Sequence, residues 1–405
     1  MTQDIEKPSM SGGAAPAPTP TVNWVARARE LAPMIEAAGA KTEQDCKVTS
    51  DVMAALHGAE LFRMLLPRSI GGGEATPLEL MKVLEVVGAA DGSTAWCLGQ
   101  GLGCSIAAAF LDRGVAEDIF AAPDAVGAWG PPAGVAKAVK TDGGYRSSGR
   151  WKYASGSPNV TWFGGHSTVC DGDGTPLKDA DGGMVRRTMM IPADRVKLHN
   201  TWHVIGLRGT GSDDYEVSDL FVAEDHTFWR DNLDELRETG PLYRIPLLTF
   251  YGIGFAGVAL GIARASLDAF KDLAMDKVAH NRPNALRQSP VIQAELAQAE
   301  GKLRSARAFL IEMIEETWEI MQSEGERSLE QKALLRVSIT HALNQSREVT
   351  TAAYHAAGGT AVFEANPFER RLRDIFSVSQ QGQAHLANFE FAGQALMGDI
   401  PSHRL

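Results

Sequence analysis

Apolar residues recur at helical spacing through the first part of the chain, from residue 22 to residue 66. The positions that carry this spacing include Trp24, Val25, Ala28, Leu31, Met34, Val52 and Leu56. Residues 78–90 continue the pattern as an apolar helix that begins after Thr76-Pro77 and ends at Asp91-Gly92-Ser93. Residues 94–110 are almost wholly apolar or small, which is typical of a buried helix. We therefore expect a helical domain over residues 22–122.

The spacing changes after residue 123, where short apolar and aromatic runs alternate with Gly, Asp and Pro. Such runs predict strands joined by turns. They lie at 126–132, 133–139, 144–151, 161–170, 187–191, 196–199 and 214–222. The segment 171–183 is rich in Asp and Gly but lacks the terminal Glu of a calcium-binding loop at the proper spacing, so we interpret it as a solvated turn region. We expect a small β-domain over residues 123–232.

Helical spacing returns in the last part of the chain and continues to its end. Four helices are predicted, at 249–275, 291–321, 329–357 and 369–397. Helices of this number and length favour an up-and-down bundle over residues 233–405. The first of them carries Gly252, Gly254, Gly257 and Gly261, which permit close contact between helices or leave room for a ligand. The predicted fold class is α+β, mainly α.

Composition and motifs argue against several classes of protein. The 405 residues carry a net charge of −11 without a long basic run, which gives nucleic-acid binding little support. The sequence has no metal-binding histidine motif, P-loop, nucleophile elbow or dinucleotide fingerprint, and we expect no metal. No run of about 18 apolar residues stands out, so we expect no membrane span.

The first 21 residues and the cysteines bear on the expected cellular compartment. Residues 1–21 are rich in Pro, Ala, Gly and Ser and lack the pattern of a secretory signal, which predicts a disordered tail. The four cysteines are Cys46, Cys97, Cys104 and Cys170, and they show no CxxC spacing. Free thiols in a reducing cytoplasm are the simplest interpretation.

The stretch 149–163 is rich in aromatic and small residues, a composition that could line a ligand site. It reads as two strands around a corner of small residues, with the sequence Gly149-Arg-Trp-Lys-Tyr-Ala-Ser-Gly-Ser-Pro-Asn-Val-Thr-Trp-Phe163. A glycine at such a corner lets the backbone approach a flat ligand. The stretch is either an aromatic-rich hairpin or a wall for a planar cofactor whose polar edge meets the Ser155 hydroxyl.

Together with other motifs, this stretch resembles the flavin-contacting strand of the acyl-CoA dehydrogenase superfamily, and more narrowly its branch of two-component flavin-dependent monooxygenases. Enzymes of that branch act on phenols, steroid phenols, aromatic sulfur and amines. The similarity extends over nearly the whole chain from residue 22 onward and implies the acyl-CoA dehydrogenase fold. Its motifs are Gly-x-Trp-x-x-x-Ser-Gly at 149–156, Asp91-Gly92-Ser93-x-x-Trp96, and the segments 200–212, 355–360 and 366–374.

The resemblance implies a flavin, FMN or FAD, against the corner formed by Ser155 and Gly156. It further implies that Trp202 flanks the flavin ring and that Trp129 lines the same cavity. The superfamily often places a phosphate-binding arginine at the position of Arg282, although a surface ion pair is an alternative there. A Gly-Gly turn, here Gly358-Gly359, would approach the cofactor phosphate from a neighbouring subunit.

The expected catalytic residues are Ser155 and His385. Monooxygenases of this branch carry a histidine near the position of His385, in the final helix, close to the reactive edge of the flavin. Acyl-CoA dehydrogenases instead use a carboxylate there or on the first bundle helix, near Tyr251, and this chain has none at either place. Removing a proton next to a thioester needs such a base. Oxygen chemistry needs a dry pocket with hydrogen-bond donors, although His385 is alternatively structural.

The resemblance thus implies a monooxygenase that takes reduced flavin from a separate reductase, adds O2 at flavin C4a to form a hydroperoxide, and oxygenates a small organic substrate. Gln100, Cys104 and Tyr251 are the expected substrate-pocket residues, and the buried helix lacks the histidine typical of phenol hydroxylases. One alternative is a flavoprotein that desaturates an acyl thioester with an electron-transfer partner. Another is a non-catalytic flavin-binding or structural oligomer. The resemblance also implies a homotetramer.

Overall fold

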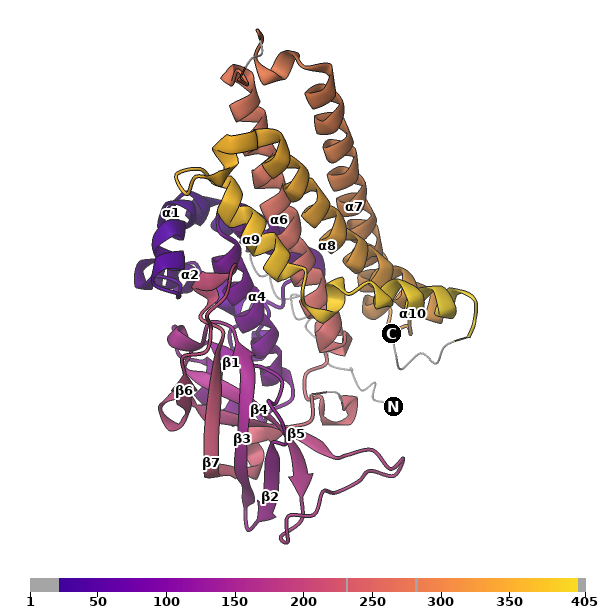
Figure 1. Ribbon diagram of the computed structural model, residues 1–405. Helices are drawn as coiled ribbons and strands as arrows, with labels where there is room; N and C mark the ends of the chain where they lie inside the picture. Colours follow the sequence, from indigo (N-terminus) through magenta and orange to yellow (C-terminus); the bar gives the residue numbers. More distant parts are fainter. Residues whose placement is uncertain (1–21, 231, 281–282, 400–405) are drawn as a thin grey trace, which may run out of the picture.

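The structure is a computed structural model that describes residues 22–230, 232–280 and 283–399 (Figure 1). The predicted disordered tail and Arg282 lie outside the described residues. Strands gather at one end of the molecule, and long helices extend away from them at the other end (Figure 1). The order of helices, strands and helices is the predicted one.

Five α-helices precede the sheet: α1 (Trp24–Gln44), α2 (Ser50–Gly58), α3 (Pro77–Ala90), α4 (Gly92–Ser105) and α5 (Arg113–Phe120). α3 begins with a capping box, in which the Thr76 hydroxyl accepts from the Glu79 N–H and the Glu79 carboxylate accepts from the Thr76 N–H. α4 begins at the buried carboxyl of Asp91, which accepts from the Thr94 N–H at 2.7 Å. The helix predicted at 94–110 is therefore α4 followed by a short 3-10 turn, Ile106–Ala109.

Eight strands form one mixed sheet. They are β1 (Gly127–Trp129), β2 (Lys137–Thr141), β3 (Gly144–Ala154), β4 (Trp162–Cys170), β5 (Arg186–Pro192), β6 (Lys197–His199), β7 (Asp213–Ala223) and β8 (Thr227–Phe228). Their order is β6-β7-β3-β2-β4-β5-β8, and β1 pairs in parallel with β4. Trp151, Phe163 and Tyr215 are fully buried and form the centre of the core of this sheet. The seven predicted runs match β1 to β7, and only the two-residue β8 had no counterpart.

The C-terminal part contains α6 (Leu247–Asp276), α7 (Pro290–Gln322), α8 (Leu329–Ala357), α9 (Phe368–Val378) and α10 (Ala387–Leu396). The single helix predicted over 369–397 is wrong, because the chain leaves the helix between α9 and α10. There the side-chain oxygen of Gln381 accepts from the Gln383 N–H, and the Asn388 amide donates to the Gly382 and Gln383 carbonyls. These local bonds replace the helical ones.

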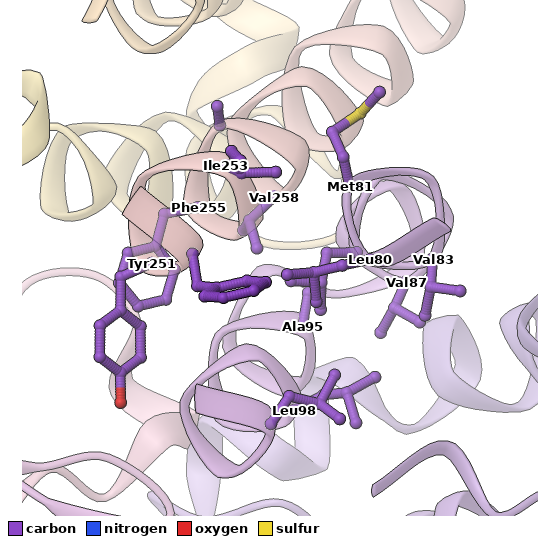
Figure 2. Close-up of a cluster of buried hydrophobic side chains, with 14 of the residues drawn as sticks. Leu80, Met81, Val83, Val87, Ala95, Leu98, Tyr251, Ile253, Phe255 and Val258 are labelled. Atoms are coloured by element: carbon purple, nitrogen blue, oxygen red, sulfur yellow. The ribbon is translucent and has the colours of Figure 1, made fainter. Parts of the chain in front are cut away.

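α6 is the central helix of the fold, and its glycines serve helix packing. A Cβ at Gly257 would lie 2.5 Å from the Met81 carbonyl oxygen, and one at Gly261 would lie 2.2 Å from that of Glu85. Figure 2 shows Ile253 and Val258 packed toward α3, while the Tyr251 hydroxyl points away from this cluster. Contrary to the expectation from sequence, one 18-residue window of α6 is apolar enough to span a membrane, with mean hydropathy 1.5, but 83% of it is buried, as in a core helix.

Candidate active site

A cavity of about 680 Å³ lies where the sheet, α4, α6 and the segment after α9 meet. Its volume suits a small-molecule or cofactor site. The predicted site residues Gln100, Trp129, Ser155, Trp202 and Tyr251 all line it. The other lining residues include Trp96, Gly130, Tyr153, His166, Arg186, Arg187, Thr188, Ser212, Trp229, Arg230, Phe255, Ser377, Gln380, Gln381 and Gln383.

The corner between β3 and β4 is the most constrained part of the wall. Tyr153 has φ of 61°, which is uncommon for a residue with a side chain, and the pairing of β3 with β7 shifts register between Trp151 and Ala154. Gly156 follows with φ of 85°, and its N–H donates to the Thr210 carbonyl at 2.8 Å. Strain of this kind is often kept at functional sites. Here it places the Tyr153 ring and the Ser155 hydroxyl at the cavity.

Ser155 is one member of a row of hydrogen bonds. Its hydroxyl accepts from the Trp96 indole N–H at 3.0 Å and lies 2.8 Å from the Ser212 hydroxyl. The Ser212 hydroxyl lies 2.6 Å from that of Thr210, which donates to the Leu207 carbonyl at 2.8 Å. Since a carbonyl only accepts, the proton of each hydroxyl must point along the row toward Leu207. Ser155 therefore donates to Ser212 and can turn its proton toward a ligand only by giving up that bond.

The inner wall is fixed by Trp129 and Tyr251, both buried. The Trp129 indole N–H donates to the Tyr251 hydroxyl at 2.8 Å, and the Gln100 amide donates to the Trp129 carbonyl at 3.3 Å. Cys104 lies behind Tyr251, with its sulfur 3.9 Å from the hydroxyl, and is not among the lining residues. Burial raises the pKa of the Cys104 thiol, so the thiol stays neutral and unreactive.

Aromatic rings cover the helical side of the cavity. The rings of Trp96 and Phe255 stack with centroids 3.7 Å apart, and the Tyr251 ring stacks on Phe255 at 5.4 Å. The Tyr153 ring meets Trp202 edge to face at 6.3 Å. The cavity is therefore lined by several aromatic rings, which suit a planar ligand.

His166 is the histidine of this cavity. Burial lowers its pKa well below the usual value, and the charges of Arg230 and Arg186 lower it further, so the imidazole is neutral. Its Nε2 lies 3.4 Å from the Arg230 guanidinium, which can only donate, so Nε2 accepts. Its Nδ1 must then carry the proton and donates to the Thr188 hydroxyl at 2.8 Å.

The charged residues described in the cavity lining are all positive. Arg186, Arg187 and Arg230 line the cavity, and none of the described lining residues is Asp or Glu. A carboxylate base for abstracting a substrate proton is thus lacking among the described residues of the wall, in line with its absence near Tyr251 in the sequence. The arrangement suits a ligand that is planar and carries acceptors or negative charge.

Gln381 offers a free donor. Its side-chain nitrogen is buried and has no hydrogen-bond partner among the described residues, although the side-chain oxygen accepts from the Gln383 N–H at 2.8 Å. A buried amide left without a partner costs stability, and such groups call for an explanation. Gln381 lines the cavity, but this nitrogen is covered by protein, so a ligand with an acceptor group would satisfy it only after the side-chain amide rotates toward the cavity.

The remaining predicted residues lie elsewhere. His385 is exposed on the turn before α10, where its Nδ1 accepts from the Ala387 N–H at 3.1 Å, and it does not line the cavity; its catalytic role stays a prediction. Gly358 and Gly359 are exposed at the end of α8, where Gly358 has φ of 57°. Their predicted contact involves a neighbouring subunit and is not tested by a single chain. Gly156 supports the corner from behind and is not a lining residue.

The sequence interpretation missed His166 and Gln381. A signal existed for His166, because side chains two apart in a strand share a face. His166 follows Gly164 by two, and a Cβ at Gly164 would lie 2.5 Å from the Trp129 ring. Gln381 had no such signal, because its position depends on the break between α9 and α10.

Comparisons with known proteins place the chain in a family. Residues 253–385 match the family model described as the C-terminal domain of acyl-CoA dehydrogenase. The chain is 33% identical over 356 residues to indole-3-acetate monooxygenase of Pseudomonas putida, an alignment that covers 87% of this chain and 88% of the relative. It is 28% identical over 412 residues to the oxygenase component of the FADH(2)-dependent resorcinol hydroxylase of Rhizobium sp., covering 97% and 98% of the two chains.

Solved structures share the fold. The HsaA monooxygenase from M. tuberculosis superposes with a TM-score of 0.84 at 22% identity, covering 94% of this chain and 98% of that one. XiaF from Streptomyces sp., in complex with FADH2 and glycerol, superposes with a TM-score of 0.85 at 22% identity, covering 93% and 96%. With the cavity described above and a relative one-third identical over most of its length, this chain belongs to the two-component flavin-dependent monooxygenases of the acyl-CoA dehydrogenase superfamily.

Proposed function

We propose that the chain is the oxygenase component of a two-component system, and that it places one atom of O2 on an aromatic substrate. Reduced flavin, FMN or FAD, would come from a separate reductase, as the name of the resorcinol hydroxylase relative indicates for that enzyme. The observation that carries the proposal is a cavity lined by aromatic rings and hydrogen-bond donors, with no described carboxylate in its lining. Bound reduced flavin would supply the activation of O2.

The residues of the corner fit a flavin ring. The Tyr153 and Trp202 rings lie in the lining with the Ser155 hydroxyl, and the Gln381 side chain lines the same cavity. We propose that Ser155, Trp202 and Gln381 hold the ring and its polar edge, with Gly130 and Trp129 closing the far side. Ser155 and Gln381 would also support the oxygen chemistry through hydrogen bonds, and bound flavin and substrate would displace water from the cavity.

The competing function, desaturation of an acyl thioester, asks for a carboxylate beside the substrate. The titratable lining group nearest that role, His166, is neutral and has both ring nitrogens engaged with Thr188 and Arg230. It therefore suits orientation of a ligand better than proton abstraction.

We propose an aromatic ring as the substrate's reacting part, held between Trp129, Tyr251 and Phe255. The relatives' names point the same way, since one names an indole and another a dihydroxybenzene. The inward-facing Tyr251 hydroxyl already accepts from Trp129, so its proton remains available to a polar group of the substrate.

We also propose a cytoplasmic homotetramer. Large apolar side chains are exposed at two places on the helical bundle, and burial against other copies of the chain would account for them: Val362 and Phe363 after α8, and Leu386, Leu396 and Met397 in and beside α10. Gly358 and Gly359 would then meet the cofactor phosphate of a neighbouring subunit. Light scattering should give four times the 43.5 kDa of one chain.

Flavin binding tests the proposed function. Purified protein titrated anaerobically with reduced FMN and FAD should bind one of them at least tenfold more tightly than its oxidised form. Ser155→Ala and Gln381→Leu should each weaken that binding. Equal and weak binding of both redox states would overturn the proposal that reduced flavin is delivered by diffusion from a reductase.

A further inference from the structure

A second, smaller chamber adjoins the active-site cavity. It has a volume of about 370 Å³ and lies between the start of α6, the start of α8 and the turn after α9. Its residues are Leu248, Thr249, Arg327, Lys332, Leu335, Arg336, Ile339, Gly382 and Gln383. Leu248 and Gln383 line both spaces, so the two are neighbours through shared side chains.

Among the described residues, Arg327, Lys332 and Arg336 line this side chamber and no Asp or Glu does. Arg336 donates to the Asn388 side-chain oxygen at 3.2 Å. Arg327 and Lys332 form no ion pair and no side-chain hydrogen bond with any residue in the described parts of the chain. Lys332 and Arg336 lie four residues apart on α8, a spacing at which like charges repel. Burial lowers the pKa of both Arg327 and Arg336, which marks the lost hydration of their charge. A bound anion would offset both costs.

The start of α6 adds to the positive character of the chamber. Its N-cap is Pro246, which offers no side-chain acceptor, so no side chain caps the first N–H groups of this 30-residue helix. The positive end of the helix dipole therefore opens beside Leu248 and Thr249. The apolar side chains of Leu335 and Ile339 complete the lining, so the chamber combines cationic and apolar side chains.

We propose that this side chamber binds the carboxylate of an aromatic acid substrate, whose ring enters the active-site cavity past Leu248 and Gln383. The inference rests on the proposed function for the reacting ring. Arg327 is the main ligand of the carboxylate, and Lys332 assists it.

The arginines of the main cavity are weaker candidates. Arg187 is paired with Glu235 at 2.9 Å, and Arg230 contacts His166. Arg186 has no ion pair among the described residues, but its side chain is exposed, where a charge pair contributes little. The unpaired and partly dehydrated charge lies in the side chamber. Arg29 of α1 is exposed and lines neither space, so it provides a control.

The proposal is tested by calorimetric titration of the purified, flavin-free protein with indole-3-acetate and with its neutral counterpart, indole-3-acetamide. The acid should bind about ten- to a hundredfold more tightly, as expected for a charge-assisted hydrogen bond. Arg327→Gln and Lys332→Gln should each reduce this preference, and Arg327→Lys should keep part of it. Arg29→Gln should leave the preference unchanged, and Arg186→Gln should reduce it less than Arg327→Gln does. Circular dichroism melts would exclude a folding defect.

Several outcomes would overturn the proposal. These are equal affinity for acid and amide, no binding of either, or a preference that Arg186→Gln removes and Arg327→Gln does not. A loss of FMN affinity relative to riboflavin in Arg327→Gln would assign the chamber to the cofactor phosphate instead. Because these measurements use neither reduced flavin nor O2, the chamber can fail while the monooxygenase proposal stands, and the converse also holds.

Discussion

Replacing Ser155 by alanine should separate the structural role of the hydroxyl row from its role at the cavity. The change leaves the Trp96 indole N–H without its acceptor at 3.0 Å and Ser212 without its donor at 2.8 Å. A buried polar group left unpaired costs about 1–3 kcal/mol. Trp96 is only half-buried and can recover part of this through water, so we expect a loss of about 2 kcal/mol in the free energy of unfolding.

Ser157→Ala is the matched control. The Ser157 hydroxyl is buried on the same turn and donates to the Gly211 carbonyl at 2.8 Å, but it does not line the cavity. Its loss should cost about 1 kcal/mol and leave the chemistry intact. Both variants can be compared by urea unfolding with fluorescence detection.

Activity should distinguish the two variants. If Ser155 supports developing charge during oxygen transfer, its removal should lower product formed per reduced flavin by about 10²-fold or more, with the missing oxygen recovered as hydrogen peroxide. Product and peroxide can be measured in the same reaction, with reduced flavin supplied by any flavin reductase. Wild-type product yield in Ser155→Ala, or equal losses in both variants, would refute this reasoning.

Three further predictions follow from single contacts. Gly130→Ala would place a Cβ 1.7 Å from the Lys152 carbonyl oxygen, so it should abolish soluble folded protein or its activity, whereas Gly134→Ala, with open space around it, should be neutral in yield and melting temperature. Tyr251→Phe removes the acceptor of the buried Trp129 N–H and should cost about 1–3 kcal/mol in urea unfolding; an unchanged midpoint would contradict the bond. Burial, and next the charge of Asp91, raise the pKa of Asp374 to about 7. As the pH rises, this carboxyl therefore keeps its proton in the folded chain after the unfolded chain has released it. The free energy of unfolding should fall by about 1.4 kcal/mol per pH unit between about pH 4 and pH 7 and then level off. Asp374→Asn should flatten that decline, and an unchanged pH dependence of the unfolding midpoint would argue against it.

Local pattern was enough to predict the strands and most of the helices, because apolar spacing and punctuation by Gly and Pro report short-range structure. For Ser155, Trp129 and Tyr251 the expectation came from the motifs that resemble the superfamily, and all three line the cavity. Local pattern failed at the end of α9, where side chains of Gln381 and Asn388 replace helical bonds. No spacing rule anticipates such a competition.

The same limit explains the histidines. His385 was favoured because it stands in a recognisable region, yet that region turns outward after the helix break. His166 was overlooked because its importance comes from Arg230 and Thr188, which lie far from it in the sequence and reach it only through the sheet. The side chamber likewise joins residues from α6, α8 and the turn after α9.

The central claim is that this cavity transfers oxygen and does not remove hydrogen. The most direct measurement is mass spectrometry of product formed under ¹⁸O2 from an aromatic acid such as indole-3-acetate, with reduced flavin supplied enzymatically. The account predicts a product that carries one ¹⁸O atom and no oxygen from water at that position. Peroxide as the sole oxygen product, or a desaturated thioester formed from acyl-CoA without O2, would contradict it.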